Sequence, residues 1–167
     1  MLKKVLLGLG AASAALVVLA AFLYITNAAP TPTAIGRAHD PTRPYVVKLH
    51  AQWCPVCMAT KSVWAQIESV YATRVNLVVF DFTSDATTET SRQKAKRLGL
   101  EAYFDDYVGA TGTISVLAGG TRQEVTSIHG SRNFTDYRDA IEAALKDAAR
   151  TAGQEFQESD PAPSALR

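Results

Sequence analysis

The chain holds two cysteines, Cys54 and Cys57, separated by two residues in the sequence WCPVC. Such a pair can cycle between dithiol and disulfide, bind a metal, or form a structural disulfide. Pro55 suits a first helical turn, and apolar side chains then recur at three- and four-residue steps. A helix that begins on the pair brings both cysteines to one face, with Cα atoms about 5–6 Å apart, which a disulfide accepts.

The expected helix start makes the two thiols unequal. Cys54 lies at or before the first turn, where free N–H groups and the positive end of the helix dipole stabilise a thiolate. Cys57 lies one turn deeper and is expected to be less exposed and to stay protonated longer. We therefore predict a redox-active disulfide in which Cys54 attacks and Cys57 resolves. So short a ring contributes little loop entropy, which disfavours a purely structural bond.

The elements that must position this pair follow from hydrophobic periodicity. The first two strands are joined by a helix, which predicts that they are parallel, and the nearly continuous apolar run 75–82 is typical of a central buried strand. Gly119 and Gly120 mark a hairpin turn, and Gly99 marks a helix end. The expected strands are 45–51, 75–82, 113–119 and 123–130, and the expected helices are 55–71, 86–98 and 133–150.

This order of elements around WCPVC resembles the thioredoxin-like superfamily over residues 42–148. The segment AKRLGL and Gly130, between the last strand and the last helix, add to the resemblance. The resemblance implies a thioredoxin-like α/β fold, β-α-β-α-β-β-α, with a central mixed sheet of about four strands flanked by helices. It also implies thiol–disulfide oxidoreductase activity without a dissociable cofactor. Trp53 and Pro55 then belong to the active-site environment, with Trp53 on the surface where client proteins dock.

The sequence departs from the family pattern around the active site. Lys48 stands where the family usually keeps a buried acid. It either lowers a cysteine pKa as a nearby charge or points outward with only its stem buried. Thr111, Gly112 and Thr113 replace the loop that usually carries a cis-proline. A cis bond without proline costs about 2.5–4 kcal/mol, so a trans bond is expected, and Gly112 would let a client backbone approach closely. Ser62 replaces the kink proline of the active-site helix.

An insertion, EAYFDDYVGA at residues 101–110, precedes this loop. Its aromatic side chains, Tyr103, Phe104 and Tyr107, allow two interpretations. They either form a rim specific to one partner or pack into the core. The sequence leaves both open.

The start of the chain predicts a membrane location. Residues 5–25 carry no charge and follow Lys3 and Lys4. As a helix they would extend over about 30 Å, the thickness of a bilayer core. We expect a single-pass transmembrane anchor in the inner (cytoplasmic) membrane, with a cleaved signal peptide as the alternative. The positive-inside rule then places the C-terminal domain in the periplasm or extracytoplasmic space.

The expected organisation has four parts. They are the N-terminal transmembrane helix or signal peptide at 1–25, a Pro- and Thr-rich tether at 26–41, the thioredoxin-like domain at 42–150, and a polar disordered tail at 151–167.

The expected partners follow from this location and from the charge. A net charge of +1 gives no support for nucleic-acid binding. We expect client proteins with thiols or disulfides, the membrane through the anchor, and a membrane electron donor that keeps the cysteines reduced. The direction of the reaction stays open, although a single anchored domain favours a reductase.

Two alternatives to an oxidoreductase also stay open. Structural zinc requires four ligands, and the chain has no second cysteine pair, so no metal site is expected by default. A copper-handling protein would use the two cysteines with one of the three histidines, His39, His50 or His129. The third alternative is a redox-inactive docking module.

Overall fold

The computed structural model describes the backbone of residues 39–159 and the side chains of residues 39–153. The predicted order of strands and helices is confirmed, with the first predicted helix divided in two and one short helix added. The elements are β1 (Tyr45–His50), α2 (Pro55–Ala59), α3 (Lys61–Tyr71), β2 (Asn76–Asp81), α4 (Asp85–Leu98), α5 (Glu101–Asp106), β3 (Thr113–Leu117), β4 (Glu124–His129) and α6 (Phe134–Ser159).

The predicted anchor at 1–25, most of the tether and the last residues of the tail lie outside the described residues. Among residues 39–159, no helix combines the length and the apolar character that a membrane span needs.

The four strands form one mixed sheet in the order β2-β1-β3-β4. β1 is parallel to β2, as predicted, and antiparallel to β3. β3 and β4 form the predicted antiparallel hairpin. Because β1 is an inner strand, the loop that follows its last residue, His50, emerges beside the end of the sheet where β3 begins.

The central position predicted for the second strand is wrong, because β2 lies at an edge of the sheet. Its apolar character has a different cause. Val78 and Phe80 are buried on one face of the sheet, and Leu77 and Val79 pack against the hydrophobic cluster on the other face. β2 is therefore apolar because helices cover both of its faces, and not because strands flank it on both sides.

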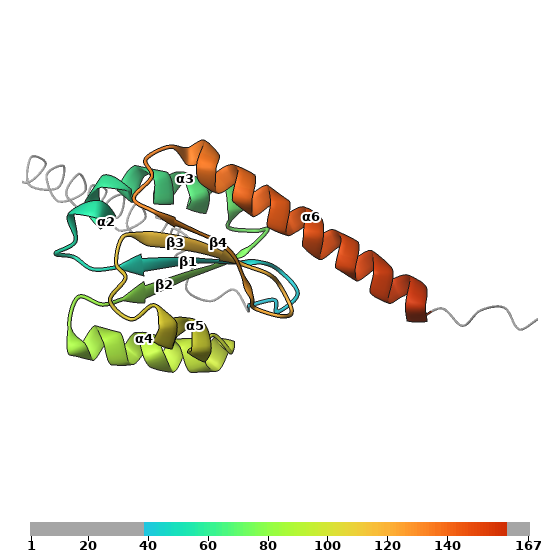
Figure 1. Ribbon diagram of the computed structural model, residues 1–167, viewed down its shortest axis with the longest axis horizontal. Helices are drawn as coiled ribbons and strands as arrows, with labels where there is room; N and C mark the ends of the chain where they lie inside the picture. The colour runs from blue at the N-terminus through green and yellow to red at the C-terminus, as the bar shows by residue number, and fades with distance from the viewer. Residues whose placement is uncertain (1–38, 160–167) are drawn as a thin grey trace, which may run out of the picture. The chain divides into compact units, whose positions relative to one another are not determined.

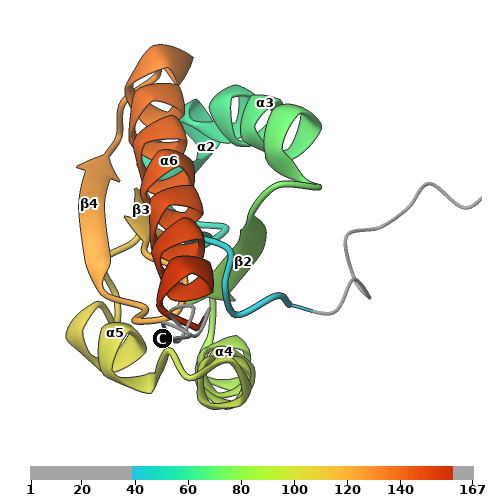
Figure 2. The ribbon, with the colours of Figure 1, turned by 90° about the vertical axis from the view of Figure 1, so that its right-hand side faces the viewer.

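Helices cover both faces of the sheet (Figure 1). α2, α3 and α6 lie on one face, and α4 and α5 lie on the other. Figure 2 shows the same layers along the sheet, with α6 crossing beside β3 and β4. The α3 and α6 side is filled by a cluster that includes Trp64, Ile67, Tyr137 and Ile141.

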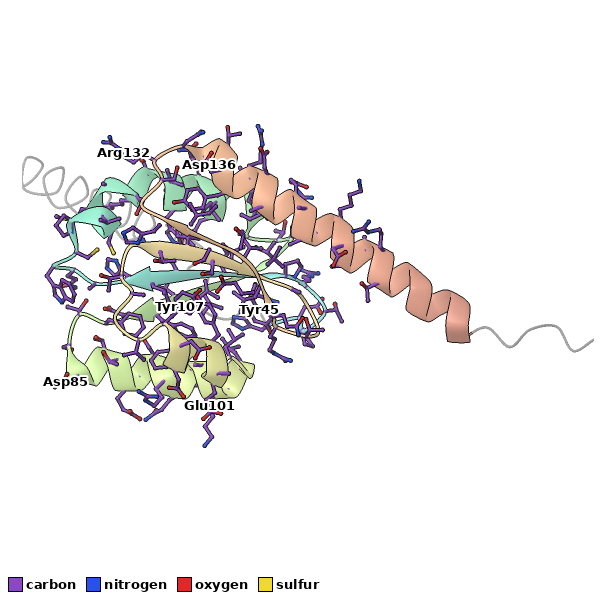
Figure 3. The ribbon with its side chains drawn as sticks, viewed as in Figure 1. Tyr45, Asp85, Glu101, Tyr107, Arg132 and Asp136 are labelled. Atoms are coloured by element: carbon purple, nitrogen blue, oxygen red, sulfur yellow. The ribbon has the colours of Figure 1, made fainter. Side chains whose placement is uncertain are left out.

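The insertion at 101–110 forms α5, and its aromatic residues pack rather than forming a partner rim. Phe104 meets Phe80 edge to face at 5.1 Å between ring centroids. The buried Tyr103 donates its hydroxyl to Ser115 Oγ at 2.8 Å and stacks on Tyr107 at 4.7 Å. Figure 3 shows Tyr107 between α5 and the strands. The insertion thus completes the core beneath β1 and β3.

The helix predicted over 55–71 is not continuous, because it breaks at Thr60 into α2 and α3. The Thr60 hydroxyl donates to Val56 O at 3.0 Å and to Cys57 O at 3.4 Å. A threonine that bonds back to the preceding turn competes with the helical hydrogen bonds and bends the chain. The break therefore occurs without a proline, two residues before Ser62.

The last helix extends further than predicted. α6 continues to Ser159, so residues 151–159, expected as part of a disordered tail, are helical. Thr151 Oγ1 donates to Asp147 O at 3.2 Å, and Arg150 pairs with Asp147. No proline occurs between Pro55 and Pro161, and residues 151–159 include two glutamines and two glutamates, which favour helices. Polarity alone therefore did not distinguish an exposed helix from a tail.

Candidate redox site

The local sequence places the two cysteines at the first turn of α2. Cys54 is the N-cap residue in an extended conformation, and Pro55 takes a first-turn position where no N–H is needed. The backbone N–H of Cys57 donates to Cys54 Sγ at 3.2 Å. The Cys57 thiol lies 3.6 Å from the carbonyl oxygen of Leu49 on β1. Both cysteines are free thiols within hydrogen-bonding reach of one another.

Exposure does not separate the two thiols as the sequence suggested. Cys54 is 4% exposed and Cys57 is 2% exposed, so both residues are buried. Burial raises the pKa of Cys54, but hydrogen bonds from the Cys57 thiol, the Thr111 hydroxyl and the backbone of Cys57 and Val56 outweigh it and lower the pKa. The difference between the cysteines is therefore one of hydrogen-bond donors.

The pKa of Cys57 moves in the opposite direction. Burial is the largest cause that raises the pKa of Cys57, and the hydrogen bond to Cys54 and the charge of Cys54 raise it further. Backbone hydrogen bonds with Ala51 and Gly112 oppose this change only in part. The site thus holds one thiol with a lowered pKa beside one with a raised pKa, as an attacking and a resolving cysteine require.

The loop opposite the cysteines consists of Thr111, Gly112 and Thr113. Residues 39–159 contain no cis peptide bond, so the trans bond expected before Gly112 is present. Gly112 has a φ of 88° and donates its N–H to Leu49 O at 2.9 Å. A Cβ atom on Gly112 would lie 2.7 Å from Val56 Cγ1. Glycine is required here for both its backbone conformation and its contact with α2.

A second glycine contacts the same side chain. Gly130, at the end of β4, has a φ of 68°, and a Cβ atom there would lie 3.1 Å from Val56 Cγ1. Its N–H donates to Gly112 O at 3.1 Å. Next to it, His129 Nδ1 lies 3.1 Å from Thr113 Oγ1. Val56, the residue inside the Cys-x-x-Cys motif, is thus seated against two glycine backbones.

The surface around the cysteines is apolar and partly exposed. Trp53 is 62% exposed, and its indole Nε1 donates to Thr83 O at 3.2 Å, which fixes the ring beside the pair. Met58, directly after Cys57, is 63% exposed. Sequence reasoning singled out Trp53 and Pro55 but missed Met58, Val56 and Thr83. The position of Val56 and Met58 beside the cysteines in the sequence could have identified them. Nothing in the sequence indicates that Thr83 contacts Trp53.

Lys48 does not point outward. The residue is 8% exposed, and its Nζ lies 5.3 Å from the centroid of the Trp64 ring. Burial lowers the pKa of Lys48, while the charges of Cys57 and Glu68 raise it. The Lys48 side chain is therefore buried against Trp64, and the charge of the resolving cysteine acts on it.

The histidines do not join the cysteines in a metal site within the described part of the chain. Residues 39–159 contain no group of three histidine, cysteine, aspartate or glutamate side chains placed to hold a metal ion. His39 stacks on Tyr45 with ring centroids 6.2 Å apart, and His129 contacts Thr113. His50 carries a buried Nδ1 without a hydrogen-bond partner among these residues. The ligand set of the copper alternative is thus not assembled here.

Replacing Thr111 by valine is expected to raise the pKa of Cys54. The variant keeps the side-chain volume and removes a hydroxyl that stabilises the Cys54 thiolate. A hydrogen bond to a charged acceptor contributes about 1.5–3 kcal/mol, so alkylation of Cys54 should slow severalfold at neutral pH. The pH dependence of the alkylation rate measures the change. Thr113→Val is the matched control, because that hydroxyl contacts His129, and an equal effect of both variants would contradict the assignment.

Comparison with known proteins finds distant similarity to solved structures. No protein-family model matches the sequence, and no curated protein matches it. Among solved structures, the chain is similar to Trxlp from Edwardsiella tarda EIB202, with 19% identity, TM-score 0.42, and coverage of 60% of this chain and 82% of that one. It is also similar to Fasciola hepatica thioredoxin, with 23% identity, TM-score 0.39, and coverage of 62% and 82%.

A third similar structure is a thiol:disulfide interchange protein of the thioredoxin family from Chlorobium tepidum TLS. It has 21% identity and a TM-score of 0.43, with coverage of 63% of this chain and 81% of that one. At these identities and TM-scores the likeness assigns no function to this chain. The thioredoxin-like α/β fold is carried by the observed strand order, the strand directions and the helices on both faces.

Proposed function

We propose that the chain is a thiol–disulfide oxidoreductase that acts through Cys54 and Cys57. The observation that carries the proposal is the position of Cys54 as the N-cap of α2, with the Cys57 N–H on its sulfur at 3.2 Å and opposite changes in the two pKa values. A buried structural cysteine has no need of a lowered pKa, whereas an attacking thiolate does.

The reaction follows from this arrangement. The Cys54 thiolate attacks a client disulfide, forms a mixed disulfide, and releases one client sulfur as a thiolate. Cys57 loses its proton to water and attacks Cys54 Sγ. The Cys54–Cys57 bond forms, the bond to the client breaks, and the second client sulfur leaves as a thiolate that takes a proton from water. The client disulfide is reduced by two electrons, and the cysteine pair is oxidised by two electrons.

The proposed direction is reduction of client proteins outside the cytoplasm. The uncharged run 5–25 behind two lysines supports a membrane anchor with the domain on the extracytoplasmic side. Each turnover leaves the pair oxidised, so a reductase in that compartment needs a membrane electron donor. The exposed Trp53 and Met58 beside the cysteines supply an apolar surface for a client.

Redox equilibration of the full chain tests the direction. A reductase is expected to have a reduction potential well below the value of about −120 mV that is typical of a strong periplasmic oxidant. Quantifying thiol and disulfide forms in buffers of known potential gives the value. A potential near −120 mV would contradict a reductase while leaving the oxidoreductase chemistry in place.

A further inference from the structure

One buried lysine, Lys48, lies in the middle of the sheet. Lys48 belongs to β1, an inner strand, and pairs in register with Val79 on β2 and Ile114 on β3. Its side chain reaches the Trp64 ring of α3, with Nζ 5.3 Å from the ring centroid. Trp64 in turn donates its indole N–H to Glu68 Oε1 at 2.6 Å. The lysine is thus held between β1 and α3 by packing and a cation–π contact.

The charges around Lys48 come from three elements. Cys57 faces it from α2, Glu68 and Lys61 act on it from α3, and His50 lies two residues further along β1. Within the described residues, the Lys48 ammonium makes no hydrogen bond or ion pair. Taking an ammonium out of water without a partner is costly. Of the groups around it, Cys57 is the one that the proposed reaction converts to an anion.

The geometry near Cys57 supports this pairing. Cys57 Sγ lies 3.6 Å from the carbonyl oxygen of Leu49, the residue that follows Lys48 on β1. Attraction between Cys57 and Lys48 is the largest effect that opposes burial in setting the pKa of the lysine. Among residues 39–153, no carboxylate is among the groups that principally shift the pKa of Cys57, and the buried ionisable side chain on which Cys57 acts is Lys48.

We propose that Lys48 is a positioning residue that holds the negative charge of Cys57 during the resolving step. This inference rests on the proposed oxidoreductase function and deepens it. Cys57 gives its proton to water, and its thiolate forms beside the Lys48 ammonium. The thiolate then attacks Cys54 Sγ, the Cys54–Cys57 bond forms, and the departing sulfur leaves Cys54 with its electron pair. Once the disulfide forms, Lys48 loses its anionic partner.

Removing the Lys48 charge is expected to slow the resolving step. Without the ammonium, the Cys57 thiolate is less stable, so the pKa of Cys57 rises and the fraction of thiolate at neutral pH falls. The remaining thiolate is more nucleophilic, with a Brønsted coefficient of about 0.4–0.5. For each tenfold loss of thiolate, resolution is therefore expected to slow by about three- to fourfold. Attack by Cys54, which has its own hydrogen-bond donors, should change little.

The test follows two coloured thiolates released from one aromatic disulfide. The reduced full chain is mixed in a stopped-flow instrument with one equivalent of the reagent. Attack by Cys54 releases the first thiolate, and resolution by Cys57 releases the second. Rates are compared above neutral pH, where His50 is uncharged because burial and the charge of Lys48 lower its pKa. Lys48→Met is expected to slow the second release at least threefold and to move its pH profile upward.

Two further variants control for packing. Lys48→Arg keeps a cation over Trp64 and should retain most of the second-phase rate. Lys94→Met removes another half-buried lysine with a lowered pKa, one that donates to Val79 O at 3.0 Å from α4 on the opposite face of the sheet. It should leave both phases unchanged. Far-ultraviolet circular dichroism reports whether each variant is folded.

The outcomes separate this inference from the function on which it rests. If wild type releases both thiolates and Lys48→Met releases the second at an unchanged rate and pH profile, the inference is wrong and the oxidoreductase stands. Equal slowing of both phases, or equal slowing by Lys94→Met, also overturns it, because that pattern reports general packing. If wild type releases no second thiolate, the proposed function and the inference fail together.

Discussion

Replacing Cys54 by serine is expected to abolish disulfide reduction by the full chain. Cys54 carries the lowered pKa and the hydrogen-bond donors that stabilise an attacking thiolate. A serine hydroxyl in the same place stays protonated at neutral pH and is a poor nucleophile without a strong base. The rate of reduction of an aromatic disulfide should fall by at least about a thousandfold, to the level without protein.

The matched control is Cys57→Ser, which removes the other thiol of the same pair. This variant keeps the attacking sulfur, so it should release the first coloured thiolate and then stall as a mixed disulfide. Cys57→Ser is therefore expected to release one thiolate and form a mixed disulfide, whereas Cys54→Ser is expected to do neither. Full activity in both variants would contradict the redox function and favour a docking module.

Replacing Gly112 by alanine is expected to destabilise the chain by about 2–5 kcal/mol. A side chain at a φ of 88° costs about 1–2 kcal/mol, and pressing a Cβ atom to 2.7 Å from Val56 Cγ1 adds about 1–3 kcal/mol of overpacking. Because Val56 lies between the cysteines, the strain is passed directly to α2. Denaturant unfolding of the full chain measures the loss of stability.

Gly109→Ala separates the two contributions. Gly109 also has a positive φ, of 83°, but a Cβ atom there would meet nothing within 4 Å. The Gly109→Ala variant should therefore lose only the about 1–2 kcal/mol that a side chain costs at a positive φ. Equal losses at Gly109 and Gly112 would show that the contact with Val56 contributes nothing, and would leave the positive φ as the whole reason for glycine opposite the cysteines.

Helix starts and ends could be predicted from neighbouring residues in the sequence. Ser84 caps α4 in a capping box with Thr87, and Gly99 ends the helix in a left-handed conformation, as the predicted helix over 86–98 required. The start of α2 on the cysteine pair was predictable for the same reason, because Pro55 has few other places in a helix. These features depend on neighbours in the sequence, which a reader of the sequence can see.

The features that were mispredicted or left open depend on residues far apart in the chain. The edge position of β2, which was mispredicted, depends on β3 pairing with the other side of β1. The position of the Lys48 side chain, which the sequence left open, depends on Trp64 on α3. The buried state of Cys54 follows from the loop that contains Thr111, which the sequence places far downstream. Hydrophobic periodicity predicts which face of an element is covered, but not by which partner.

The most direct test of the central claim is to trap the reaction halfway. The Cys57→Ser variant of the full chain, expressed in its native host, should accumulate a mixed disulfide between Cys54 and a client protein. That adduct should migrate as a larger species on a non-reducing gel, collapse on addition of a reductant, and be missing when Cys54 is also replaced by serine. A Cys57→Ser chain that forms no such adduct, or one that persists without Cys54, would contradict a redox pair that attacks through Cys54 and resolves through Cys57.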